Sequence, residues 1–347
     1  MEHISEHQFG QVTVRVEEVH VESHEETLTD TILDRSYLPC PIIGSEYEIP
    51  STLEAIHLVA NRIVKIQNIP NLPHLQTLSL RQNLIEKIEN ISHLTSLTEL
   101  DLYENKIKKI EGIDTLTHLI LLDFSFNSIE KIEDINSPHL ESLFFVKNFI
   151  AKIENLETLT NLKNLELSEN NLTKIENLHG QSNLKALWLA NNYISKIENL
   201  EPLTNISILA LQNNRITRIE NLEPIITTLE ELYLSMNGIS SLDGLQLCQG
   251  LKVLDLAYNR LTNITGISVL QSLEDLWLND NQINDWNDVH YELSQLSNLS
   301  TVYLTRNPIA KDKMYRLKVL QAQPKLLQID AVPVMENLRK MAVGKSS

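Results

Sequence analysis

The residues of this chain that could carry chemistry are eleven histidines, two cysteines and a large excess of carboxylates. None of them has a catalytic or ligand spacing, because the chain lacks the G-x-x-x-x-G-K, G-x-G-x-x-G, H-E-x-x-H and G-x-S-x-G motifs. Cys40 and Cys248 form no C-x-x-C pair, which fits a reducing compartment. We therefore expect a protein that is not an enzyme and that uses neither a metal nor another cofactor.

Charge narrows the class of partner. The net charge is −17, from 46 acidic and 29 basic residues, and residues 1–50 hold 11 of the acids against two arginines. Such acidity disfavours nucleic acids and anionic membranes and favours a protein partner with a basic surface. No stretch of 18 apolar residues is present, so we expect no membrane span.

A repeated phrase positions these carboxylates. The phrase is L-x-x-L-x-L-x-x-N, as in Leu162, Leu165, Leu167 and Asn170, and its Asn recurs in steps of 22 residues, apart from one step of 21, one of 23 and a last one of 26. We call these residues the ladder asparagines: Asn61, Asn83, Asn105, Asn127, Asn148, Asn170, Asn192, Asn214, Asn237, Asn259, Asn281 and Asn307.

The period identifies a leucine-rich repeat, in which each coil buries its apolar face against its neighbours. We predict an α/β solenoid of twelve repeats of about 22 residues, with a parallel sheet on the concave side and 3₁₀ or short helical turns on the convex side. The seventh position after a ladder asparagine is Asn, Gly or Asp in eleven cases. Positive φ and helix capping both explain that choice.

Four segments follow from where the repeat begins and ends. Residues 1–45 are predicted to be an acidic, mostly disordered tail, although QVTVRVEEVHVE within them has the alternation of a strand. Residues 46–307 form the solenoid, 308–334 a C-terminal cap and 335–347 a flexible tail.

The repeat also selects which side chains face outward. Side chains alternate along a strand, so the residue between the last two leucines of each phrase points to the concave side. This central column is His57, Ser79, Asp101, Asp123, Phe144, Glu166, Trp188, Ala210, Tyr233, Asp255, Trp277 and Tyr303. Five of the twelve are aromatic and four are acidic, in a chain with only 5% aromatic residues.

The predicted face is large enough for a protein. Together with its flanking columns it carries ten acids and three bases, and twelve strands about 4.8 Å apart make a face roughly 50 Å long. Aromatic anchors with acidic neighbours are typical of a protein interface. The alternative is that the aromatic side chains cover the sheet and the acids maintain solubility.

The phrase I-x-x-I-E-N-L and the end of the repeats carry a family resemblance. After Asn307-Pro308 come Tyr315-Arg316, Val319, Pro324, Leu326 and Ile329-Asp330, in the spacing of a leucine-rich-repeat cap. The chain resembles the leucine-rich-repeat regulatory subunits of protein phosphatase 1 over about residues 45–335. The resemblance implies that the concave face binds the phosphatase catalytic subunit. The matching positions are Asp123, Phe144, Glu166, Trp188, Asp275, Trp277 and Tyr303.

The resemblance implies further that the phosphatase is held inactive or immature, that a second inhibitor protein takes part, and that the protein occupies nucleus and cytoplasm. The chain has no segment of the form R/K-V/I-x-F/W, through which most regulators of this phosphatase dock, and the resemblance implies docking by the concave face instead. Two alternatives stay open, an adaptor for a spliceosomal protein and an adaptor for a cytoskeletal or axonemal protein.

Overall fold

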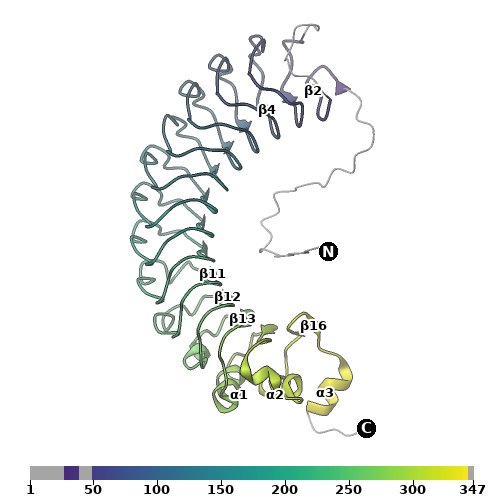
Figure 1. The fold of residues 1–347 in the computed structure, drawn as a ribbon, viewed down its shortest axis with the longest axis vertical. Coiled ribbons are helices and arrows are strands. Elements are labelled where there is room, and N and C mark those ends of the chain that lie inside the picture. The colour runs from purple at the N-terminus through teal and green to yellow at the C-terminus, as the bar shows by residue number, and fades with distance from the viewer. Residues whose placement is uncertain (1–26, 39–48, 343–347) are drawn as a thin grey trace.

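The computed structural model describes residues 27–38 and 49–342, which form a curved arch of stacked coils. Strands line the inner, concave surface and loops form the outer, convex surface (Figure 1). In the described residues the strands make one sheet, and their order in the sheet is their order in the chain.

Twelve of the strands correspond to the twelve predicted repeats, and each pairs in parallel with the next. They are β3 (Ala55–His57), β4 (Thr77–Ser79), β5 (Glu99–Asp101), β6 (Leu121–Asp123), β7 (Ser142–Phe144), β8 (Asn164–Glu166), β9 (Ala186–Trp188), β10 (Ile208–Ala210), β11 (Glu231–Tyr233), β12 (Val253–Asp255), β13 (Asp275–Trp277) and β14 (Thr301–Tyr303). This confirms the predicted solenoid and its concave parallel sheet.

Each strand has only three residues, and its middle residue points into the core. Leu165 in β8 is fully buried, whereas Asn164 and Glu166 on either side of it are partly exposed. The core consists almost entirely of leucine and isoleucine in repeated layers. Phe124 and Phe145 replace the last leucine of the phrase in two adjacent repeats, and their buried rings stack with centroids 5.5 Å apart.

The ladder asparagines join each coil to the one before it. The Nδ2 of Asn170 donates to the carbonyl of Phe145 in the preceding coil (2.8 Å) and to the carbonyls of Leu167 and Ser168 in its own coil (both 3.1 Å). Its Oδ1 accepts the backbone N–H of Ile150 at 2.9 Å. The same arrangement recurs from Asn83 to Asn307.

The convex side is built from turns rather than continuous helix. Bonds from residue i+3 to residue i, such as the one from the Leu94 N–H to the Ile91 carbonyl (2.9 Å), give single 3₁₀-type turns. Within the described repeats only η1 (Ile267–Val269) and α1 (Trp286–Ser294) are long enough to count as helices.

Backbone geometry explains the choice of Asn, Gly or Asp at the seventh position. Ten of those eleven residues have positive φ, and the exception, Asp288, lies in α1. At Gly244 (φ 99°) a Cβ atom would lie 2.0 Å from the Ile219 carbonyl oxygen, so only glycine fits. Asn177 uses its side chain as well, donating to the carbonyl of Ile153 at 2.7 Å.

Ordered structure extends beyond the predicted start of the solenoid and beyond the predicted end of the cap. The hairpin of β1 (Thr27–Leu28) and β2 (Ile32–Asp34) lies within the predicted disordered tail, and β2 pairs in parallel with β3. At the other end α3 (Glu336–Ala342) lies within the predicted flexible tail and packs Leu338 and Ala342 against the core. The QVTVRVEEVHVE segment lies outside the described residues.

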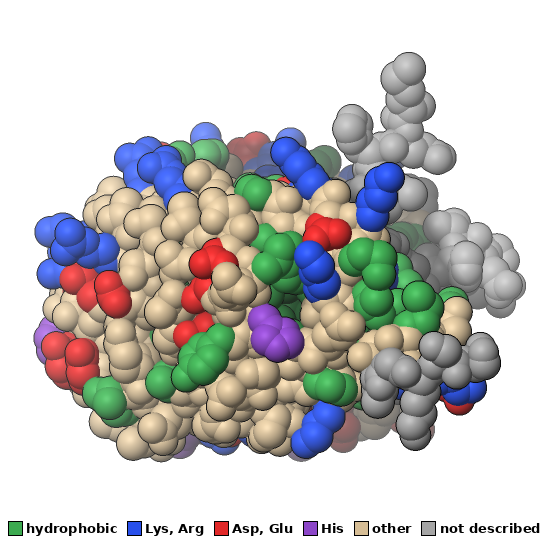
Figure 2. Space-filling model, turned by 90° about the horizontal axis from the view of Figure 1, so that it is seen from below, with side chains coloured by type: hydrophobic (Ala, Val, Ile, Leu, Met, Phe, Trp, Pro, Cys, Tyr) green, Lys and Arg blue, Asp and Glu red, His purple; other side chains and the backbone are tan. Residues whose placement is uncertain are grey.

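The C-terminal cap comprises η2 (Pro308–Lys311), α2 (Tyr315–Ala322), β15 (Gln328–Ile329) and β16 (Val332–Pro333). Asp330 ends the ladder, because its Oδ1 accepts the N–H groups of Leu304 (3.0 Å) and Thr305 (2.9 Å) and the Tyr315 hydroxyl (3.2 Å). Seen from this end of the arch, the surface mixes basic, acidic and apolar side chains (Figure 2).

We expect Asn170→Leu to lower the free energy of unfolding by roughly 1–3 kcal/mol, because the substitution leaves buried backbone groups of two coils unpaired. Chemical denaturation measures the loss. Asn171→Leu is the matched control, since the adjacent side chain makes only one long hydrogen bond (3.4 Å). Equal stability of the two variants would contradict the role given to the ladder.

Candidate protein-binding face

The central column is one row of the sheet. The register pairs Asp123 with Phe144, Phe144 with Glu166 and Glu166 with Trp188, and farther along it pairs Trp277 with Tyr303. All seven residues predicted to bind a partner are partly exposed on the concave side. Their common face is thus observed, and their role in binding stays a prediction.

The structure separates the seven residues into two groups. Asp123, Phe144, Glu166 and Trp188 occupy the adjacent strands β6 to β9. The second group, on β13 and β14, contains Asp275, Trp277 and Tyr303. Three strands lie between the groups, and they contribute Ala210, Tyr233 and Asp255 to the central column.

Trp277 is the centre of an aromatic cluster in the second group. Its ring lies 6.1 Å from that of Tyr233 and 6.2 Å from that of Tyr303, which it meets edge to face at 87°. The Tyr233 hydroxyl donates to Glu231 (2.7 Å), and the Tyr303 hydroxyl accepts from Gln328 (2.6 Å). The tyrosines are therefore held in place, as is expected of preorganised anchors. Tyr233 belongs to this cluster although it was not among the seven predicted residues.

The acids of the central column accept hydrogen bonds from the backbone and so stabilise the fold. Asp101, Asp123, Glu166 and Asp255 each accept the backbone N–H two residues farther on, at 3.0, 2.8, 3.3 and 3.0 Å. These bonds satisfy N–H groups just beyond each three-residue strand. Part of the acidity of the face is thus explained without any partner.

Two of these carboxylates remain electrostatically unfavourable. Burial raises the pKa of Asp123 to about 6 and that of Glu166 to about 7, despite the hydrogen bonds from Ser125 and Ser168. Neither forms an ion pair with any residue in the described part of the chain, whereas Asp101 lies 3.6 Å from the Arg81 guanidinium. A cation placed beside Asp123 or Glu166 would stabilise the charged form.

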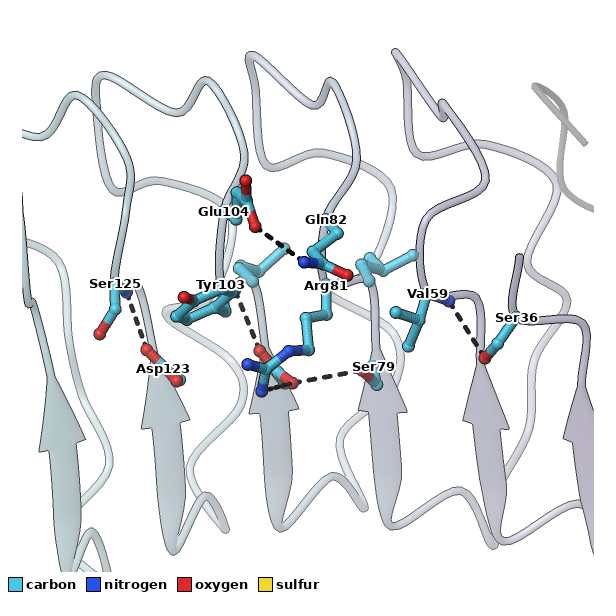
Figure 3. Close-up of polar contacts among 12 residues, drawn as sticks. Ser36, Val59, Ser79, Arg81, Gln82, Tyr103, Glu104, Asp123 and Ser125 are labelled. Atoms are coloured by element: carbon cyan, nitrogen blue, oxygen red, sulfur yellow. Dashed lines mark hydrogen bonds and ion pairs between the residues drawn. The ribbon is translucent and has the colours of Figure 1, made fainter. Parts of the chain in front are cut away.

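The flanking columns of the face form a cation–aromatic row near its N-terminal end; the sequence places these residues on the face but does not predict their contacts. The Arg81 guanidinium lies 4.0 Å from the Tyr103 ring, that ring lies 4.8 Å from Phe126, and the Lys147 ammonium lies 5.0 Å from Phe126. Figure 3 shows the Arg81 side chain extending from its own coil toward Tyr103 of the next coil. The available signal was the spacing from the ladder asparagines: Phe126 and Lys147 stand one residue before one, where φ is positive (57° and 55°), and Arg81 and Tyr103 stand two residues before.

The described residues were also compared with the arrangements of a metal site, a reactive thiol and a membrane span. Within residues 27–38 and 49–342, no group of three His, Cys, Asp or Glu side chains lies close enough together to hold a metal ion. The Cys248 thiol is buried, and burial raises its pKa to about 11. In the same part of the chain, no helix has the length and apolar character needed to cross a bilayer.

Three family models match the chain, and all describe leucine-rich repeats. One, described as "Leucine-rich repeat", covers residues 209–345. Another, "Leucine rich repeat", covers residues 51–107, and "Leucine Rich repeats (2 copies)" covers residues 95–137. Together they agree with the period read from the sequence and with the coils of the structure.

Several similar curated proteins are named as regulatory subunits of protein phosphatase 1. Regulatory subunit 7 of Xenopus tropicalis is 49% identical over 49 residues, 14% of each chain. Regulatory subunit SDS22 of Schizosaccharomyces pombe is 42% identical over 64 residues, covering 18% of this chain and 19% of the relative, and regulatory subunit pprA of Dictyostelium discoideum is 39% identical over 72 residues, 21% of each. These matches therefore span about a fifth or less of the relatives' own length.

Solved structures reproduce the arch over most of the chain. An internalin from Listeria monocytogenes superposes with a TM-score of 0.66 at 25% identity, covering 82% of this chain and 88% of its own. A leucine-rich-repeat protein of Leptospira interrogans gives 0.64 at 27% identity, covering 81% and 78%. The chain is therefore a leucine-rich-repeat protein, and stretches of it resemble the regulatory subunits of protein phosphatase 1.

Proposed function

We propose that the protein is a non-catalytic regulatory subunit that binds the catalytic subunit of protein phosphatase 1 through its concave face and controls the activity or maturation of that enzyme. The resemblance to named regulatory subunits supports the choice of partner. The acidic and aromatic composition of the concave face supports the choice of surface.

The burial of the Glu166 carboxylate in an aromatic row is the observation that carries the proposal. In the row of the central column, Glu166 lies between Phe144 and Trp188 of the neighbouring strands, and burial raises the pKa of its carboxyl to about 7. An acid kept in that environment weakens the folded state at neutral pH. A partner's Lys or Arg would pair with the carboxylate and pack against the two aromatic rings, which turns the unfavourable charge into binding energy.

The spacing of the two groups suits a broad contact. Glu166 on β8 and Trp277 on β13 are five strands apart, or about 24 Å at the usual strand spacing. One folded partner can span that distance, whereas a small metabolite cannot. Such a partner would bury two separate anchor regions, which is common in protein interfaces of ordinary size.

The proposal also includes a location in the nucleus and cytoplasm and a second inhibitor protein in the same complex. Both follow from the resemblance alone.

Affinity purification from a cell lysate tests the partner against the spliceosomal and cytoskeletal or axonemal alternatives. Recovery of the phosphatase by the wild type, and its loss with a concave-face variant, supports the proposal. Recovery of splicing or axonemal proteins without the phosphatase would replace it. Phosphatase activity, measured in the purified complex and after its separation, tests control of the enzyme.

Trp277→Ala is expected to weaken binding of the phosphatase catalytic subunit about thirtyfold, because a central aromatic anchor typically contributes ~2 kcal/mol or more. Calorimetry measures the affinity, and a thermal melt checks that the fold is unchanged, since the indole lies outside the core. Lys109→Ala, on the exposed convex flank, is the control and should change neither quantity. Equal affinities of the wild type and Trp277→Ala would reject the concave face as the binding surface.

Glu166→Gln is expected to stabilise the free protein at pH 8 by on the order of 1–3 kcal/mol. The pKa of Glu166 is about 7 in the folded state against 4.5 for an ordinary glutamate, so the folded protein binds the extra proton between these values. Wild-type stability therefore falls as pH rises from 4.5 to 7, and the advantage of the variant disappears below pH 4.5.

Denaturation curves from pH 4 to 8 measure this difference, with the exposed Glu169→Gln as the control. The same Glu166→Gln variant should bind the phosphatase more weakly at pH 8, since it cannot pair with a cation. A variant that is no more stable than the wild type at pH 8 would contradict the assigned cost of this carboxylate.

A further inference from the structure

The two ends of the sheet expose apolar side chains. Repeat proteins need a polar outer face on their terminal coils, because an uncovered coil presents its apolar layer to water. Within the described residues the sheet ends in the hairpin β1–β2 on one side and in the hairpin β15–β16 on the other. Large exposed apolar residues belong to both hairpins or directly flank them: Leu28 (49%) and Ile32 (40%) at the first, and Leu327 (63%), Val332 (42%) and Met335 (65%) at the second.

The strand register shows that the apolar core continues into both hairpins. The buried middle residues of the parallel strands form one column, which begins at Leu33 and ends at Ile329. Leu28 is paired with Leu33, and Val332 is paired with Ile329. Residues directly opposite each other on antiparallel strands project to the same face, so Leu28 and Val332 are the outermost members of this column. In the part of the chain that the structure describes, no further coil covers either of them.

At the C-terminal end the exposed apolar residues are neighbours. The Val334 N–H donates to the Leu327 carbonyl at 2.8 Å, so Leu327 lies opposite Val334 and on the same face of the hairpin as Val332. Met335 follows directly, and its carbonyl accepts the Arg339 N–H at 3.2 Å. We call Leu327, Val332 and Met335 the end patch. In the view from this end of the arch, apolar side chains lie beside basic ones (Figure 2).

The C-terminal end is basic, although the chain as a whole is strongly acidic. Residues 308–347 hold eight Lys and Arg against three Asp and Glu, in a chain with a net charge of −17. All three acids are already engaged. Asp312 pairs with Lys318, Glu336 pairs with Lys340, and Asp330 accepts backbone N–H groups of the last repeat. The other bases at this end therefore keep their positive charge uncompensated by these acids.

Two arginines bring positive charge to the end patch. Arg316 donates to the carbonyls of Ile329 (2.8 Å) and Val332 (3.0 Å), and Arg339 donates to two carbonyls just before Leu327 (both 2.6 Å). Neither guanidinium forms an ion pair with another residue of the described chain, and each has five N–H donors, of which these bonds use two. Both therefore favour a partner that brings carboxylates.

The N-terminal end carries the opposite charge. Residues 1–50 hold 11 acids against two arginines. Asp30 is exposed in the turn between β1 and β2, next to the exposed Leu28 and Ile32. One end of the molecule is thus apolar and acidic, and the other is apolar and basic. Opposite ends attract each other, whereas two copies of the same end repel.

We infer that the protein binds a second copy of itself head to tail, with the hairpin β1–β2 of one copy on the end patch of the next. Each end then covers the apolar layer of the other, as a neighbouring coil does within the repeats. The contact joins two different surfaces, so it is heterologous and leaves a free end for a further copy. The surfaces are small, so assembly is weak and depends on concentration, and salt weakens it by screening the charges.

The test is analytical ultracentrifugation of the full chain over a range of concentrations at low and high salt. The sedimentation coefficient of the wild type should rise with concentration, and less so at high salt. The N-terminal variant Leu28→Ser, Ile32→Ser and the C-terminal variant Leu327→Ser, Met335→Ser should each self-associate at least about tenfold more weakly. An equal mixture of the two variants should form dimers and nothing larger, because it retains one intact pair of ends.

The controls separate the ends from general apolar area and from damage to the fold. The variant Ile120→Ser, Leu247→Ser also removes two exposed apolar side chains, 44% and 60% exposed, but away from both ends, and should assemble like the wild type. Asp30→Lys changes only an exposed charge and should also weaken assembly. Thermal melts check that all variants remain folded.

Three results would overturn the inference. The first is a wild type that stays monomeric up to its solubility limit. The second is wild-type assembly by either end variant alone, because like ends would then bind each other. The third is a mixture of the two end variants that forms no dimer. None of these results bears on the concave face, so the proposed function is tested independently.

Discussion

The hydrogen bonds between each ladder asparagine and the coil before it are the interaction on which the rest of the structure depends. A strand of three residues cannot fix its own register, and a sheet of such strands could slip. Asn170 binds carbonyl and N–H groups of two successive coils, so it fixes both the turn and the step between coils. Every outward residue is then placed at a repeated interval along the concave side.

That constraint explains how far the sequence could be interpreted. Because the ladder fixes register, counting from each Asn placed Asp123, Phe144, Glu166 and Trp188 in one row, and the strand pairing agrees. The N-terminal limit was harder to predict. The register aligns Leu33 with Ile56, so Leu38 occupies the position of Asn61, and β2 carries no asparagine to reveal it.

Other features depend on the local backbone and on burial, which the repeat does not encode. The rings of Tyr103 and Phe126 lie 4.8 Å apart across two coils, and Phe126 has a left-handed backbone, with φ of 57°. The raised pKa of Glu166 results from burial among neighbouring side chains, and its position in the column alone gives no hint of it. The repeat spacing therefore predicts which residues lie on the face, whereas the contacts and the burial of those residues can be obtained only from the structure.

A solenoid can tolerate an unfavourable charge more readily than a compact domain can. Each coil contacts only its neighbours, so the destabilisation caused by Glu166 is local and the leucine layers of adjacent coils offset it. The face can thus hold partly buried acids between aromatic side chains without losing the fold. In the proposed complex, such acids would favour encounter with a basic surface, and the aromatic side chains would slow dissociation once contact is made. Separating these two tasks along one row lets either be changed by substitution without repacking the core.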